Sequence, residues 1–150
     1  MTHPLLKLGA VSRATNIPLP TLGRWLDRGT IKQSRRDKAS TGSGEHRQFS
    51  RNTIVQIAIA RKFIELGINA GRANAAAALF TDHGQRNRAP GEPFAEGLTI
   101  LALRPTGASV FNAQFDADFS ELSDFGVAFV AIDCGKICKT MDAILISQTI

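Results

Sequence analysis

The chain has 150 residues, 43% of them hydrophobic, and carries a net charge of +5. This length and apolar content allow a buried core in one domain or in two small ones. No stretch approaches the ~18 consecutive apolar residues of a membrane-spanning helix, and the first residues lack the apolar segment of a secretory signal. We therefore expect a soluble, cytoplasmic protein.

The positive charge is unevenly distributed along the chain. Residues 1–88 contain 15 Lys and Arg against 5 Asp and Glu, whereas residues 89–150 contain 3 against 8. A basic half of this kind is typical of proteins that bind a polyanion. The change coincides with the Gly- and Pro-rich sequence DHGQRNRAPGEP. We therefore predict a domain over 1–84, a linker over 85–93 and a second domain over 94–150.

The first residues predict two short helices with a tight turn between them. Leu8, Val11 and Ala14 share one helical face. Prolines 18 and 20 suit the first turn of a second helix, because proline has a helical φ and needs no N–H partner there. Apolar residues at i, i+3 and i+4 then continue this helix, and Gly29 follows as a stop signal.

The second helix has a basic face that lies away from its apolar face. Thr21, Arg24 and Arg28 occur at i, i+3 and i+7, whereas Trp25 belongs to the apolar face and is expected in the core. Two short helices, the second exposing basic residues, are typical of a helix-turn-helix, whose second helix enters the major groove of DNA. Taken alone, the two arginines could also belong to an ordinary solvated face.

The segment from Ile31 to Phe49 predicts a basic hairpin. Its centre, ASTGSG, is too polar and too flexible to belong to a core. A hairpin beside the second helix, called a wing, would place its cations next to the phosphates that flank the groove. We therefore assign seven cations to one DNA-facing surface: Arg24, Arg28, Lys32, Arg35, Arg36, Lys38 and Arg47.

Residues 7–68 resemble the winged helix-turn-helix of MerR-type transcriptional regulators. The resemblance rests on KLGAVSRATNI, on TLGRWLDRGTI as the recognition helix, on GEHRQFS at the end of the wing and on RNTIVQIAIARKFIELGI as the next helix. It implies that Thr21, Arg24 and Arg28 lie in the groove and that Arg47 lies near the DNA backbone.

Some features depart from the family pattern. His46 stands where a wing tyrosine is common, and we include it among the expected DNA contacts. The wing, from Lys32 to Gly44, is longer than usual. The family generally dimerises through one long helix after the DNA-binding domain, whereas here glycines and prolines interrupt the chain between Gly84 and Pro93 and strand-like sequence follows.

A helix with two apolar faces is predicted after the wing. Ser50 is a good N-cap residue, and Gly67 lies just past the last apolar turn. One face holds Ile54, Ile57, Ala58 and Ile64, and the other holds Val55, Ile59, Phe63 and Leu66. Such a helix needs two partners: its own domain, and either the C-terminal domain or a second subunit. Asn69 then caps a further, alanine-rich helix.

The second half predicts a small sheet of about three strands with a covering helix. Leu98–Leu103 and Val110–Phe115 form a hairpin, and Phe125–Asp133 is an apolar run of strand length. Ile137, Met141, Ile144 and Leu145 follow at helical spacing. The fold class is therefore α+β. We expect this unit to dimerise, or to dock RNA polymerase or another protein.

No motif of an enzyme, a metal site or a cofactor site is recognisable. Cys134 and Cys138 lack the second ligand pair of a structural zinc site and are expected to be buried, reduced thiols. The histidines have no Ser or Cys partner pattern, and no phosphate loop or nucleophile elbow occurs. An acidic stretch lacks the pattern of a calcium loop and is interpreted as solvated; it comprises Asp116, Asp118, Glu121 and Asp124.

Three functional hypotheses remain open at this point. The leading hypothesis is a sequence-specific, DNA-binding transcriptional regulator that acts as a homodimer on a roughly palindromic site. The alternative is an excisionase-like or other architectural protein that bends DNA for site-specific recombination. A protein-interaction adaptor, whose basic half only confers solubility, would have no affinity for DNA.

Overall fold

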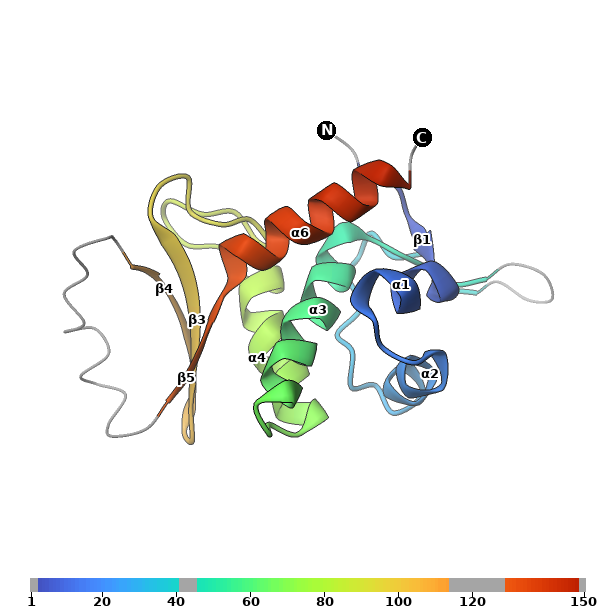
Figure 1. The fold of residues 1–150 in the computed structure, drawn as a ribbon, viewed down its shortest axis with the longest axis horizontal. Helices are drawn as coiled ribbons and strands as arrows, with labels where there is room; N and C mark the ends of the chain where they lie inside the picture. The colour runs from blue at the N-terminus through green and yellow to red at the C-terminus, as the bar shows by residue number, and fades with distance from the viewer. Residues whose placement is uncertain (1–2, 41–45, 114–128, 149–150) are drawn as a thin grey trace.

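The computed structural model describes residues 3–40, 46–113 and 129–148 (Figure 1). Helices dominate the first part of the chain, and a sheet with one helix follows, so the predicted α+β class is confirmed. No helix in these ranges is long and apolar enough to cross a membrane. The elements are β1 (Leu6–Lys7), α1 (Leu8–Thr15), α2 (Leu19–Asp27), β2 (Gln48–Phe49), α3 (Arg51–Glu65), α4 (Ala70–Asp82), β3 (Leu98–Arg104), β4 (Gly107–Ala113), β5 (Val130–Asp133) and α6 (Cys134–Ser147).

The strands form two antiparallel sheets. β1 pairs with β2, and the second sheet has the order β4-β3-β5. In that sheet Leu101 lies opposite Val110 on one side and opposite Ile132 on the other. The predicted three-stranded sheet and its covering helix are therefore confirmed. Residues 114–128, which include the acidic stretch and the ends of two predicted strands, lie outside the described residues.

The helices α1 and α2 form the predicted pair with a tight turn. Asn16 ends α1 with a φ of 53°, in the left-handed region that asparagine tolerates better than most residues. Pro18 precedes α2, and Pro20 lies in its first turn. Gly29 has a φ of +65° just after the end of α2, a conformation that glycine adopts without steric cost.

α3 lies at the centre of the fold, and both of its apolar faces are covered within the chain. α1, α4 and α6 all contact it, and α6 crosses over it in Figure 1. Ile54, Ile57 and Phe63 are fully buried. α6 therefore supplies the second partner that the sequence left open between the C-terminal part and a second subunit. Leu66, expected on the second face, is instead 60% exposed because it follows the end of the helix.

The two cysteines lie in the first two turns of α6. Both thiols are free and buried. Burial raises the pKa of each thiol, that of Cys138 to about 11, so both are protonated at neutral pH. Because the thiolate is the reactive form, these cysteines are chemically inert in the folded protein.

The segment predicted as a linker is held in place by one buried arginine. The guanidinium of Arg88 donates hydrogen bonds to the carbonyl oxygens of Phe80 at 3.0 Å, His83 at 2.6 Å and Glu92 at 3.2 Å. It also lies 4.7 Å from the centre of the Phe80 ring. The main apolar core is continuous from Leu6 to Leu145 across this segment. The division of the chain into two domains stays a prediction.

A second buried arginine joins the start of α3 to α6. The side chain of Arg51 is 7% exposed, and its Nε and Nη2 atoms donate to the two carboxylate oxygens of Asp142 at 2.5 and 3.0 Å. Its Nη1 atom contacts the carbonyl oxygen of Gly91 at 2.8 Å and the carboxylate of Glu92 at 3.0 Å. Burial alone would lower the pKa of Arg51, but these carboxylates, Asp142 foremost, raise it above its usual value.

We expect the substitution Asp142→Ala to lower the free energy of unfolding by about 2–4 kcal/mol, because it leaves the Arg51 charge buried without its main partner. The expected loss of stability is smaller than for a fully buried ion pair, because the Asp142 side chain is 30% exposed and solvent partly screens its charge. Urea denaturation followed by circular dichroism measures the change.

Lys139→Ala, at an exposed position on the same helix, is the matched control and should change stability by less than about 0.5 kcal/mol. The double variant Arg51→Met/Asp142→Ala should lose less than the sum of the two single losses, because no charge is left buried. Additive losses would contradict the assigned ion pair.

Candidate nucleic-acid interface

The outer face of α2 carries the first group of predicted DNA contacts. Arg24 and Arg28 are exposed, and Thr21 is half-buried. The Nη2 atom of Arg24 lies 3.4 Å from the hydroxyl oxygen of Thr21, one turn earlier on the same face. Leu22 is fully buried on the opposite face, and Trp25 is half-buried and packs against the core. α2 is therefore fixed by its apolar face while its arginines point to solvent.

The segment after α2 carries the second group. Lys32, Arg35, Arg36 and Lys38 are all exposed. Lys38 pairs with Gln48 in an isolated antiparallel bridge, whose two backbone hydrogen bonds measure 2.9 and 3.0 Å. This bridge is the part of the hairpin predicted from 31 to 49 that the described residues show. Residues 41–45 lie outside the described residues.

His46 and Arg47 follow on the returning side and are also exposed. Gln48 and Phe49 then form β2, which pairs with β1 at the N-terminal side of α1. α2, the segment after it and this returning side all lie at the same end of the molecule in Figure 1. The structure therefore brings all nine predicted residues to one end of the molecule.

The carboxylate of Asp37 ties this basic segment to the start of α3. It accepts hydrogen bonds from the backbone N–H of Ser34 at 2.8 Å, from the backbone N–H of Ser50 at 2.6 Å and from the Thr53 hydroxyl at 2.6 Å. Ser50 occupies the predicted N-cap position, but its hydroxyl makes no capping hydrogen bond. A carboxylate from a distant loop holds the start of the helix instead.

The side-chain amide of Gln56 fixes the other end of the segment. Its Oε1 atom accepts from the backbone N–H of Lys32 at 2.9 Å, and its Nε2 atom donates to the carbonyl oxygen of Lys32 at 2.9 Å. Gln56 and Thr53 are each only 1% exposed. Together with Asp37 they form what we call the polar clamp, which positions the backbone that carries Lys32, Arg35, Arg36 and Lys38.

Sequence reasoning missed the polar clamp. Two features of the sequence could have indicated it. One is a glutamine within the otherwise mostly apolar α3 sequence TIVQIAIA, and the other is a single aspartate among the cations of the basic segment. A buried polar side chain needs a hydrogen-bond partner, so Gln56 in that position implied a nearby backbone segment. Which segment it contacts follows only from the three-dimensional structure.

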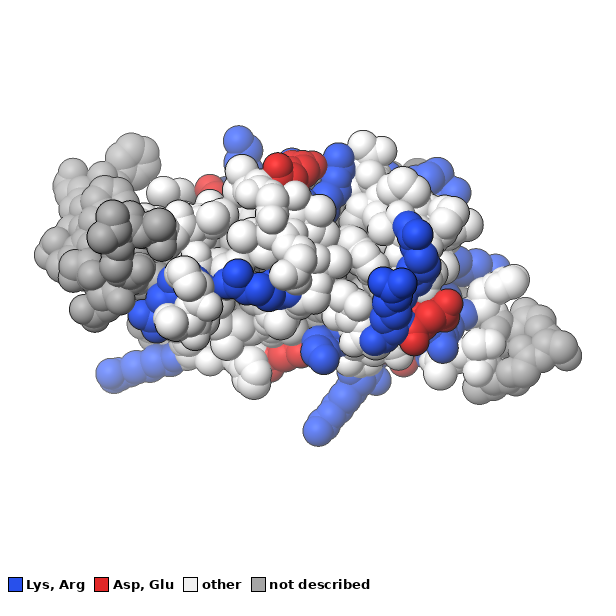
Figure 2. Space-filling model, turned by 90° about the horizontal axis from the view of Figure 1, so that it is seen from below, with Lys and Arg blue, Asp and Glu red and all other residues white. Residues whose placement is uncertain are grey.

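The charge around this interface is mainly positive. Figure 2 shows Lys and Arg side chains spread along this face of the molecule, several of them over the end where α2 lies, with an acidic group among them. Lys7 on β1 and Arg13 on α1 are further exposed cations that the sequence-based list did not include. A surface of this sign attracts polyanions.

The acidic residues, histidines and cysteines of the described ranges are not gathered into a metal site. These ranges contain no group of three or more His, Cys, Asp or Glu residues that could hold a metal ion. His3 lies with its Nε2 atom 3.8 Å from the carboxylate of Asp142 and so belongs to the Arg51 ion-pair group.

Comparison with known proteins finds a similarity in the N-terminal part of the chain. Residues 6–77 match the family model described as MerR HTH family regulatory protein. A search among curated proteins gave no match. The matched segment begins at β1, ends within α4 and contains every residue of the predicted interface together with the polar clamp. Residues 6–77, just under half of the chain, are therefore similar to the helix-turn-helix of MerR family regulatory proteins.

Proposed function

We propose that this protein is a sequence-specific transcription regulator that binds duplex DNA as a homodimer. In this proposal α2 is the recognition helix in the major groove, and the segment from Lys32 to Arg47 is a wing on the flanking phosphates. The observation that carries it is the exposure of Arg24 and Arg28 on a helix whose opposite face is anchored by Leu22.

The recognition role of α2 rests on the chemistry of its exposed face. An arginine guanidinium makes two parallel hydrogen bonds to the O6 and N7 atoms of guanine, which is the commonest base-specific contact. Arg24 and Arg28 lie one turn apart and can reach neighbouring base pairs. Thr21 supports Arg24 by its contact with the Nη2 atom and also offers a hydroxyl to a base or a phosphate.

The wing role rests on the polar clamp. Because Gln56 and Asp37 already fix the backbone between Lys32 and Lys38, less chain entropy is lost when the cations of this segment meet phosphates. Phosphate contacts set the register of a protein on DNA without reading its sequence. His46 and Arg47 extend the same surface on the returning side of the segment.

We expect the full chain to bind duplex DNA with an affinity that falls steeply as salt increases, since cations on phosphates release counterions. If Lys32, Arg35, Arg36 and Lys38 each neutralise one phosphate, the slope of log K against log salt is about −4 per protomer. Fluorescence anisotropy between 50 and 300 mM salt measures it. If the protein does not bind DNA at low salt, the regulator proposal is wrong and the adaptor hypothesis is favoured.

Substitutions should separate base reading from phosphate contacts. On a site selected from a random duplex library, Arg24→Ala or Arg28→Ala should weaken binding by about 1–3 kcal/mol, with little effect on a scrambled duplex. Arg35→Ala or Arg36→Ala should weaken binding to both duplexes similarly and reduce the salt slope by about 1.

Lys139→Ala removes an equal charge from α6, away from the interface, and serves as the control for these variants. If all four arginine variants behave alike on the two duplexes, the assignment of α2 to the groove is wrong. The excisionase-like alternative would be favoured if the protein's binding sites in chromosomal DNA coincide with recombination attachment sites and not with promoters.

We expect a homodimer, because one short recognition helix reads only a few base pairs and a palindromic site repeats them. We place the contact, or the docking surface for RNA polymerase or another protein, in residues 94–150. Sedimentation equilibrium should give twice the 16.2 kDa mass of the chain. The full chain is the proper sample, since truncation at 88 would cut through the continuous core. A monomer that also binds DNA one to one would contradict the proposal.

A further inference from the structure

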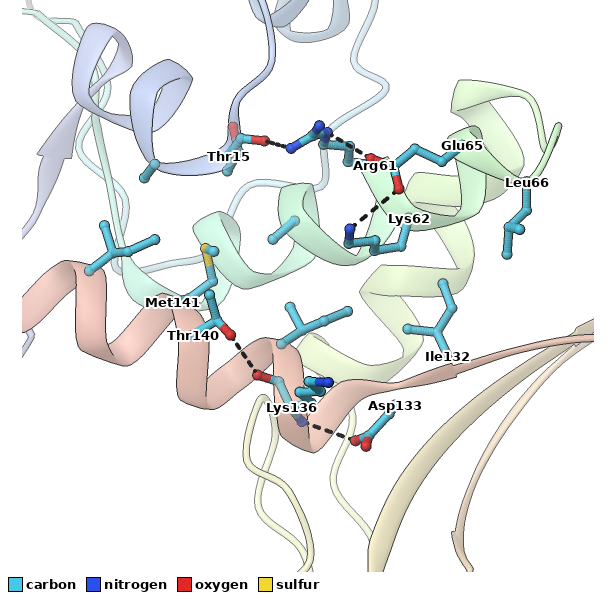
Figure 3. Close-up of a pocket in the computed structure, with 14 residues that line it drawn as sticks. Thr15, Arg61, Lys62, Glu65, Leu66, Ile132, Asp133, Lys136, Thr140 and Met141 are labelled. Atoms are coloured by element: carbon cyan, nitrogen blue, oxygen red, sulfur yellow. Dashed lines mark hydrogen bonds and ion pairs between the residues drawn. The ribbon is translucent and has the colours of Figure 1, made fainter.

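A cleft with a volume of about 600 Å³ lies between the end of α1, the second half of α3 and the β5–α6 segment (Figure 3). We propose that this cleft is a binding site for a small organic acid, a carboxylate carried on an apolar body. The proposal is independent of DNA binding, because it rests on a different part of the surface.

The floor of the cleft is apolar. Ala58, Ile132 and Met141 line it and are themselves buried. In Figure 3, Leu66 and Ile132 reach from opposite walls toward the same end of the cleft. A concave apolar site of a few hundred Å³ with a small number of polar groups is typical of small-molecule sites. An apolar body of about ten carbon atoms would displace water from this floor.

The rim of the cleft carries more positive than negative charge. Arg61, Lys62 and Lys136 line it together with only two carboxylates. One of these, Glu65, is shared by Arg61 at 3.1 Å and Lys62 at 3.3 Å. The other, Asp133, accepts a hydrogen bond from the backbone N–H at the start of α6 and caps that helix.

The charged residues of the lining are three cations and two carboxylates, so their net charge is +1, and the excess lies on the α3 wall because Lys136 and Asp133 balance on the α6 wall. On the α3 wall, two cations share one carboxylate, and Arg61 is held in place by a 2.8 Å hydrogen bond to the carbonyl oxygen of Thr15. On the α6 wall, Lys136 is exposed at the rim. A ligand carboxylate at the rim would complement this excess, whereas a ligand cation would be repelled.

The shape of the apolar surface favours a small molecule over a protein. In the described ranges the large hydrophobic side chains that stand exposed are Leu19, Leu66, Leu98, Phe129 and Ile146. Of these only Leu66 lines the cleft. The apolar area is therefore confined to the concave floor and does not extend into the broad patch that a stable protein interface of about 1,000 Å² or more requires.

Isothermal titration of the full chain with decanoate and with 2-naphthoate tests the proposal, since the two acids present a flexible and a rigid apolar body. At least one acid should bind with a dissociation constant on the order of 10–100 µM, as expected for ligands of this size. Decyltrimethylammonium, which has a chain of the same length and the opposite charge, should bind several-fold more weakly.

Two charge-reversal variants on one helix provide the matched comparison. Lys136→Glu should weaken binding of the acid by about fivefold, the scale of an exposed ion pair. Lys139→Glu makes the same charge change outside the cleft and should leave the dissociation constant unaltered. Equal binding by the two variants, equal binding of the acid and the ammonium compound, or no binding of either acid would each overturn the proposal. The titration does not involve DNA, so a failure of the protein to bind DNA would not affect the outcome for this proposal.

Discussion

The buried charge of Arg51 is the constraint on which the arrangement of this protein depends. A guanidinium that is 7% exposed must be paired, because an isolated buried charge costs several kcal/mol. Its partners are Asp142 on α6 and the segment at Gly91 and Glu92, so the start of α3 holds both α6 and this segment. The preceding residue, Ser50, donates its backbone N–H to Asp37 of the basic segment. Two adjacent residues therefore attach the candidate DNA-binding surface and the C-terminal helix to the same point of α3.

This connection explains why buried polar groups occur in a helix that is otherwise apolar. Thr53 and Gln56 would destabilise α3 if their hydrogen-bonding groups had no partners, but the backbone of the basic segment and the carboxylate of Asp37 satisfy them. The like charges of Arg35 and Arg36 repel each other, which favours an extended segment. The polar clamp opposes this tendency. The segment thus keeps its cations exposed for an external polyanion without losing a defined backbone.

Sequence reasoning predicted the elements whose signals are local. The end of α2 at Gly29, the cap of α4 at Asn69 and the β3–β4 hairpin each follow from a few adjacent residues, and each is present. The MerR-type segment was recognisable because its motifs keep their order along the chain. The pairing of Arg51 with Asp142 could not be predicted in this way, since the two residues are 91 positions apart and either could have been a solvated surface charge. The nine residues of the predicted interface were chosen by charge, by spacing and by the family resemblance, whereas polar residues inside the core position the segment that carries Lys32 to Lys38.

The path of the chain after α4 also changes what can be inferred about oligomerisation. A helix with two apolar faces suggested a second subunit, but Arg88 gathers the carbonyl oxygens at the end of α4 and turns the chain into the sheet. The chain then returns as α6 and covers α3 itself. The apolar faces of α3 therefore give no argument for a dimer, and any dimer contact must use other surfaces. Because α6 shares one core with α1 and α3, a ligand or partner that stabilises the C-terminal part also stabilises the helix-turn-helix.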